Sequence, residues 1–180
     1  MYSLMERAGQ AQFLAIGMSQ YPSSEHWLIC CGSGNNGGDG HIVASLAKSV
    51  GIYVTVWQVG GTASLSGDAK TAYEHWRSHG SEVSEAESRV PESVDAIVDA
   101  LLGTGLNGPV RMSVLSLIET LNQSTKPVIA VDIPSGLCGD TGNVLGGAVK
   151  AEHTVSFIGL KQGWRLAKHV NILENFISRA

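Results

Sequence analysis

Hydrophobic positions along the chain switch between two spacings. Residues 3–20 place apolar side chains at helical spacing, and HWLICC at 26–31 then follows as a continuously apolar run that stops at glycines. The same switch recurs, and it predicts helices over 3–20, 39–50, 66–79 and 112–123, and strands over 26–31, 52–59, 81–84 (the weakest), 94–102, 127–132 and 153–160. Apolar strands that alternate with helices are typical of a mostly parallel sheet covered on both faces. We therefore expect a three-layer α/β/α Rossmann-like fold.

Composition narrows the range of partners. The 180 residues, 43% of them hydrophobic, suffice for one compact domain. The net charge of −4 and the lack of any lysine-arginine run argue against nucleic acid as a partner. No apolar stretch approaches the roughly 18 residues that cross a bilayer. Glu6 and Arg7 stand where a signal peptide has apolar residues. We expect no membrane partner and a cytoplasmic location.

The cysteines and histidines suggest no metal or disulfide framework. Cys30, Cys31 and Cys138 are odd in number and fit neither a disulfide pattern nor a zinc motif, so we expect reduced thiols. The six histidines share no ligand spacing with cysteines or acidic residues.

The 22 glycines cluster where strands should end, which is where ligands bind in an open parallel sheet. The first cluster, GSGNNGGDG at 32–40, lies between a strand and a helix and could offer backbone N–H groups to an anion. It contains the pattern G-x-G-x-x-G, but Gln58 stands at the end of the next strand, where ordinary NAD-binding folds have an acidic residue. The oxygens of Asn35, Asn36 and Asp39 suit ribose hydroxyls or a hard cation. A tight turn with Asp39 as helix cap is the alternative.

Two later loops carry buried or strand-end acids. In VDALLGTGLNGPVR at 98–111, Asp99 interrupts an apolar strand, where a carboxylate is costly unless a cation or hydrogen-bond donors accompany it. The glycines that follow, with Arg111, could bind an anion. In VDIPSGLCGDTG at 131–142, Asp132 ends a strand and could act as a general base or hold a sugar hydroxyl. Both acids could instead serve only the local turns.

These loops, in this order, resemble the NAD(P)H-hydrate epimerase family, also called the YjeF N-terminal domain. The resemblance is carried by LMERAG (4–9), CGSGNNGGDG (31–40), VDALLGTGL (98–106), VDIPSGL (131–137), DTG (140–142) and HTVSFIGLKQG (153–163). We therefore expect one domain over 1–163. Residues 164–180 depart from the family pattern, and their apolar residues predict an amphipathic helix.

The resemblance implies an isomerase. Family members interconvert the R and S epimers of hydrated NADH and NADPH (NADHX and NADPHX) at C6, so the dinucleotide would be the substrate. A companion ADP- or ATP-dependent dehydratase, fused or separate, then restores both epimers. A homodimer is implied as well.

The resemblance also assigns residues. It implies that the substrate contacts are Asn35, Asn36, Gly37, Gly38, Asp39, Gly103, Thr104, Gly105, Leu106, Asn107, Gly108, Pro109 and Asp132. It implies a potassium ion held by Asn36, Asp99 and Ser135. Our hypothesis is that Asp132 is the catalytic acid/base, with Lys161 as a lesser candidate.

Two other classes of protein compete with this interpretation. A binding module could keep the dinucleotide pocket without turnover. The presence of Asp99, Asp132 and Ser135 favours the enzyme, and the divergent tail favours the module. An ordinary NAD-dependent dehydrogenase would need an acidic residue after the second strand and a substrate domain, and the sequence has neither. A choice between NADHX and NADPHX stays open.

Overall fold

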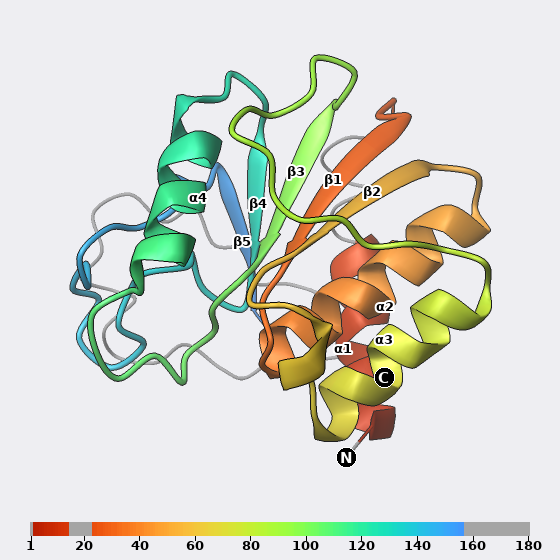
Figure 1. The fold of residues 1–180 in the computed structure, drawn as a ribbon, viewed down its shortest axis with the longest axis horizontal. Coiled ribbons are helices and arrows are strands. Elements are labelled where there is room, and N and C mark those ends of the chain that lie inside the picture. Colours follow the sequence, from red (N-terminus) through yellow and green to blue (C-terminus); the bar gives the residue numbers. More distant parts are fainter. Residues whose placement is uncertain (1, 15–22, 157–180) are drawn as a thin grey trace.

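The computed structural model describes residues 2–14 and 23–156, and this part contains one sheet of five parallel strands. The strands are β1 (His26–Cys31), β2 (Tyr53–Gln58), β3 (Ala96–Ala100), β4 (Val128–Val131) and β5 (His153–Val155). Their order across the sheet is β2-β1-β3-β4-β5 (Figure 1). The carboxyl ends of β1, β3 and β4 are therefore neighbours.

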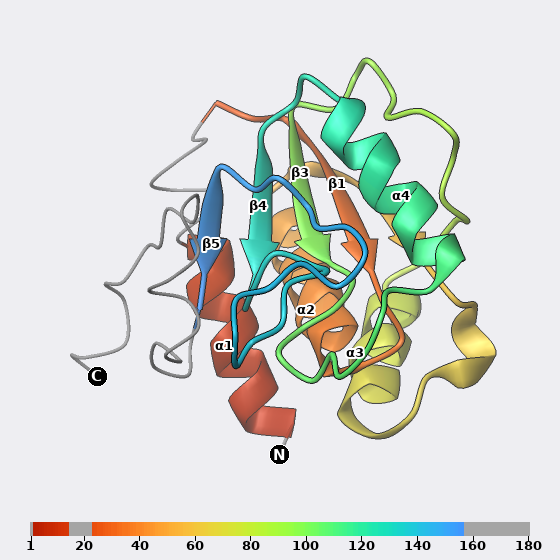
Figure 2. The same cartoon turned by 90° about the vertical axis from the view of Figure 1, so that its left-hand side faces the viewer.

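Helices cover both faces of the sheet. On one face lie α1 (Tyr2–Leu14), α2 (Asn35–Ser49) and α3 (Gly67–Ser78), whereas α4 (Met112–Gln123) lies on the other (Figures 1 and 2). A short 3-10 helix, η2 (Thr62–Ser64), follows β2. This arrangement confirms the three-layer α/β/α fold.

The central strand β1 explains why its sequence is apolar throughout. All six of its residues are buried. Alternate side chains enter opposite cores: Trp27 and Ile29 pack with α2, and Leu28 and Cys30 pack with Ile118 of α4. A strand that is covered on both faces has no side in contact with water, so apolar residues are favoured on both faces.

Most predicted elements are confirmed, and two differ from the prediction. The strand at 26–31 and the helix at 112–123 have the predicted bounds. Helix α2 begins at Asn35, four residues before the predicted start, because its glycine-rich first turns pack tightly where a loop was expected. The predicted strand at 81–84 is reduced to a single bridge between Ser84 and Trp57. Residues 15–20, 157–160 and the tail at 164–180 lie outside the described residues.

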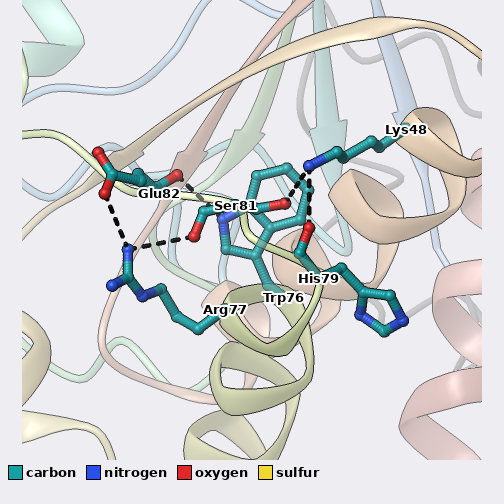
Figure 3. Close-up of polar contacts among 6 residues, drawn as sticks. All are labelled: Lys48, Trp76, Arg77, His79, Ser81 and Glu82. Atoms are coloured by element: carbon teal, nitrogen blue, oxygen red, sulfur yellow. Dashed lines mark hydrogen bonds and ion pairs between the residues drawn. The ribbon is translucent and has the colours of Figure 1, made fainter.

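The segment after α3 covers the free edge of β2. Lys48 Nζ donates to Ser81 Oγ over 2.6 Å and lies 5.5 Å from the centroid of the Trp76 ring. Trp76 Nε1 donates to the carbonyl of Glu82 over 3.0 Å (Figure 3). Ser84 then exchanges two backbone hydrogen bonds with β2, each of 2.9 Å. These contacts leave less of the strand edge open to pairing with another chain.

The three cysteines are free, as predicted. Cys30 and Cys31 are fully buried in β1, and burial raises the pKa of both thiols. They are therefore protonated packing residues rather than nucleophiles. Within the described part of the chain, no helix has both the length and the apolar character needed to cross a bilayer.

Candidate functional site

Three loops meet at the carboxyl edge of the sheet. They follow β1, β3 and β4, whose arrowheads point the same way in Figure 2. Backbone and side-chain hydrogen bonds tie them together: Gly32 N donates to Ala100 O over 3.0 Å, and Ser135 N donates to Asp99 Oδ2 over 2.8 Å. The acids that the sequence singled out on β3 and after β4 thus belong to one connected edge.

The first turn of α2 supplies Asn36 to this edge. Its side chain is only 8% exposed, and neither Nδ2 nor Oδ1 has a hydrogen-bond partner among the described residues. A Cβ atom at Gly103 would lie 3.3 Å from Asn36 Cβ and 3.1 Å from Asp132 Oδ2, so these two side chains flank a residue that has none. Buried amides are normally bonded, so Asn36 has the capacity for a ligand contact.

Asp99 is the buried acid at the centre of the site. Its Oδ1 accepts from Ser135 Oγ over 2.6 Å and from Leu101 N over 3.2 Å, and Ser135 Oγ in turn accepts from Leu102 N over 2.8 Å. Complete burial raises the pKa of Asp99 to about 6, and the hydrogen bonds from Ser135 and Leu101 oppose that rise. The donors satisfy the carboxylate without supplying a positive charge.

Asp132 stands in a strained backbone conformation. Its φ of 66° lies in the left-handed region, which asparagine and aspartate tolerate better than most residues. Its Oδ2 accepts from Thr104 N over 3.1 Å, while its own N–H donates to Val155 O over 2.9 Å. The strain turns the carboxylate out of the strand and toward the loop that follows β3.

Asp39 is the second acid next to Asp132. It is the fifth residue of α2, so the interpretation of Asp39 as a helix cap is wrong; the N-cap position is Gly34. Burial, and secondarily the charge of Asp132, raise the pKa of Asp39 to about 7. A carboxyl group with this pKa is partly protonated near neutral pH, so Asp39 can donate a hydrogen bond as well as accept one.

The other predicted substrate contacts differ in their exposure to solvent. The exposed ones are Asn35, Gly105, Asn107 and Pro109, the half-buried ones are Gly103, Thr104 and Gly108, and Gly37 is buried. Gly38 and Leu106 also pack against other parts of the protein. A Cβ at Gly38 would touch Met5 and Ala69, and its N–H already donates to Gly34 O, so the structure gives it a packing role. Leu106 packs against the core beneath α4.

Two further candidates stand apart. Arg111 is the exposed N-cap residue of α4. Lys161 lies outside the described residues.

Sequence reasoning missed two residues beside the site. Gln58 was weighed only as the absence of an acid, and His41 was grouped with ordinary histidines. Both are buried, and their side chains bond to each other over 2.9 Å. The only signal in the sequence was a polar residue at the end of an apolar strand.

The oxygen atoms of the site are of the kind that hard cations prefer as ligands. In residues 2–14 and 23–156, no three His, Cys, Asp or Glu side chains gather into a ligand group. The available donors are the free amide oxygen of Asn36, the carboxylate of Asp99 and the hydroxyl of Ser135. Asp99 has no ion-pair partner in the described part of the chain, so a cation would meet an uncompensated buried acid.

Comparisons with known proteins show the family to which the chain is similar. The family described as "YjeF-related protein N-terminus" matches residues 1–163. The bifunctional NAD(P)H-hydrate repair enzymes Nnr of Vibrio cholerae and Escherichia coli are 60% and 49% identical, each over 91% of this chain and 33% and 32% of their own length. An NAD(P)H-hydrate epimerase of Legionella pneumophila is 37% identical over 89% of this chain and 62% of its own.

The chain thus spans about a third of the length of the bifunctional relatives. A crystal structure of yeast YNL200c shares the fold, with a TM-score of 0.75 and 23% identity over 94% of this chain and 76% of that one.

Proposed function

Because the chain belongs to the family of the YjeF-related protein N-terminus, we propose that it is an NAD(P)H-hydrate epimerase domain. It interconverts the R and S epimers of NADHX and NADPHX at C6, which makes it an isomerase. The observation that carries the proposal is the carboxyl edge itself, where the carboxylate of Asp132 and the amide of Asn36, which has no hydrogen-bond partner among the described residues, flank Gly103. The names of the relatives in Vibrio, Escherichia and Legionella support the same activity.

The start of α2 and the loop at 103–109 bind the dinucleotide in this proposal. The first N–H groups of a helix have no intrahelical acceptor, and the helix dipole favours an anion there, so the pyrophosphate belongs at Asn35–Gly37. Asn36 and Asp39 face the ribose and the hydrated ring. The exposed Gly105 and Asn107 make the outer contacts.

Epimerisation needs only proton transfer at the C6 hydroxyl. Asp132 transfers a proton to the hydroxyl, which leaves as water while the ring nitrogen supplies the electron pair for an iminium ion. Water then adds to the opposite face and returns its proton to Asp132. Substrate and product have the same composition, so no oxidant or second substrate is consumed. Reversible ring opening is the alternative route, and Lys161 is the lesser candidate for the proton transfer.

A potassium ion completes the proposed site. Asn36, Asp99 and Ser135 would hold it, and it would supply the positive charge that the buried Asp99 lacks. We further propose that the epimerase domain extends over 1–163, that it forms a homodimer in the cytoplasm, and that an NAD(P)H-hydrate dehydratase, fused or separate, consumes its product. The fused relatives support that companion.

The decisive experiment is epimer exchange. R-enriched NADHX is mixed with the protein in potassium buffer, and the two epimers are followed by chromatography against the uncatalysed rate. Accelerated equilibration is expected. No acceleration, combined with a higher melting temperature in the presence of the hydrate, would favour the binding module that keeps the pocket without turnover.

Substitution of the acid tests the mechanism. Asp132→Asn is expected to lower the rate of exchange at least about 100-fold, because the amide cannot transfer the proton, while the dinucleotide still binds. Asp95→Asn is the matched control: Asp95 lies at the amino edge of the sheet, where it accepts hydrogen bonds from Glu25 N and His26 N. Unchanged exchange in Asp132→Asn would remove Asp132 from the role.

A further inference from the structure

We propose that Gln58 and His41 form a positioning pair that holds the segment at 32–40, which comprises the turn after β1 and the first turns of α2, in its binding conformation. The inference rests on the proposed function, because this segment is placed there as a dinucleotide contact. Neither residue touches the reacting atoms. Their role is to fix the backbone that carries Asn36 and Asp39.

Gln58 is attached to the loop by its amide nitrogen. The side chain is 4% exposed, and Nε2 lies 3.3 Å from Cys31 O, 3.2 Å from Gly32 O and 3.2 Å from Val59 O. Both amide hydrogens therefore have carbonyl acceptors. At the end of β2, where a dinucleotide fold would offer an acid to the ribose, this side chain turns inward and stabilises the chain itself.

The orientation of Gln58 fixes the proton on His41. Because Nε2 of Gln58 faces carbonyls, its Oε1 faces His41, so the imidazole Nε2, 2.9 Å away, carries the hydrogen. The His41 ring is fully buried and packs edge-on against Tyr73, with centroids 5.5 Å apart. Burial lowers the pKa of His41 to about 4, with the bond to Gln58 opposing the shift, so the ring is a neutral donor across the physiological range.

The carbonyl group of Gly32 connects Gln58 to the site. Gly32 O, which Gln58 holds, lies directly beneath the first turn of α2, since a Cβ atom at Gly37 would approach it to 1.9 Å. Gly32 N is bonded to Ala100 O of β3. Gln58 thus holds the point where β1 passes into α2, and His41 holds the same helix two residues beyond Asp39.

Loss of this pair predicts weaker substrate binding with intact chemistry. Asp132, which follows a different strand, β4, keeps its hydrogen bond to Thr104, so proton transfer is retained once substrate is bound. Without Gln58, the segment at 32–40 would lose the side chain that holds the carbonyl group of Gly32. KM should therefore change much more than kcat.

The test compares Gln58→Met with a control variant that removes a similar amide side chain, hydrogen-bonded to the backbone, elsewhere in the protein. Asn122 at the end of α4 donates to Ala148 O over 2.9 Å and accepts from Lys150 N over 2.7 Å, so Asn122→Leu costs stability away from the site. We expect KM for NADHX to rise at least about tenfold in Gln58→Met, with kcat within about threefold of wild type, and KM to stay unchanged in Asn122→Leu. His41→Phe should raise KM in the same direction, and the double variant should be no worse than Gln58→Met alone, because the two residues act as one unit.

Hydrogen exchange of the full chain gives a readout that is independent of turnover. Amides 33–41 should exchange at least about tenfold faster in Gln58→Met, with strand β4 unchanged. If the wild type does not accelerate epimer exchange, the proposed function fails. The hydrogen-exchange result alone then decides the positioning role. If Gln58→Met does not fold, His41→Phe carries both measurements. The proposal would be overturned if Gln58→Met left both KM and the hydrogen exchange of amides 33–41 unchanged. Equal effects in Asn122→Leu would also overturn it.

Discussion

Ser135 connects two loops of the site through one hydroxyl group. It donates to Asp99 Oδ1 and accepts from Leu102 N, so Ser135→Ala leaves a buried carboxylate and a backbone N–H each short of a partner. The expected cost is about 1–3 kcal/mol of the free energy of unfolding, measured by urea denaturation in potassium buffer. Ser113→Ala, an exposed position on α4, should cost less than about 0.5 kcal/mol. Equal stability of the two variants would show that the Asp99 network contributes nothing.

Asp39 makes stability depend on pH. Its pKa is raised to about 7 by burial and by the charge of Asp132, so between about pH 4 and pH 7 the folded state binds more protons than the unfolded one, and stability falls as the pH rises through this window. Asp39→Asn removes this loss. Between pH 5 and pH 8 the wild type should lose about 1–3 kcal/mol more than the variant does.

Guanidinium denaturation at the two pH values measures this difference, with Glu119→Gln at an exposed position on α4 as the control. The other titrating groups, Asp99 among them, are common to both proteins and cancel in the comparison. A variant that keeps the full pH dependence of the wild type would contradict the assignment.

The residues show what a sequence can and cannot predict. Asp99 and Asp132 were identifiable because an acid in or after an apolar strand needs a reason. The sequence does not show how a neutral polar side chain is oriented. Gln58 would be written the same way whether its side chain faced solvent or bonded to Gly32. The clustering of Asn36 with Asp132 depended on strand order, which the sequence pattern does not encode.

At the level of elements, strands buried on both faces were the easiest to predict. The six apolar residues of β1 have no other stable environment, and the start of α4 follows a clear change to helical spacing. The start of α2 was misplaced because glycines at 37, 38 and 40 indicate a loop by propensity. Tertiary packing overrides that preference, since the helix lies too close to its neighbours for side chains at these positions.

Gly40 gives a direct test of that override. Alanine there should favour an isolated helix by about 1 kcal/mol. In the protein its Cβ would lie 2.7 Å from Ala100 Cβ and 2.8 Å from Cys31 Sγ, and the resulting overpacking costs about 1–3 kcal/mol. We expect Gly40→Ala to lower the free energy of unfolding, whereas Gly105→Ala, with open space around it, should change it by less than about 0.5 kcal/mol. Urea denaturation decides, and a stabilised Gly40→Ala would show that α2 can move away from the sheet.

At the scale of the whole molecule, one parallel sheet accounts for the position of the site. Three strands adjacent in space but distant in sequence deliver Asn36, Asp99 and Asp132 to one edge. The placement follows from the rule that ligands bind at the carboxyl ends of parallel strands. The binding site is therefore acidic, although the proposed substrate is an anion.

That conflict of charge predicts an unusual salt dependence. The chain carries 12 basic and 16 acidic residues, so long-range forces oppose the approach of a dinucleotide, and only the short-range field at the start of α2 attracts its pyrophosphate. Raising the ionic strength from about 20 to about 200 mM shortens the Debye length to below about 10 Å and screens the long-range repulsion more than the contact. With potassium held constant and an inert chloride salt added, kcat/KM for NADHX should rise about two- to threefold.

Glu119→Lys, at an exposed position on α4, makes the net charge less negative without touching the site and should flatten this rise. A fall in kcat/KM with added salt would instead mean that a local positive field outweighs the net charge. Arg111, the exposed N-cap residue of α4, would then be the first residue to substitute, since it follows the glycines of the loop at 98–111.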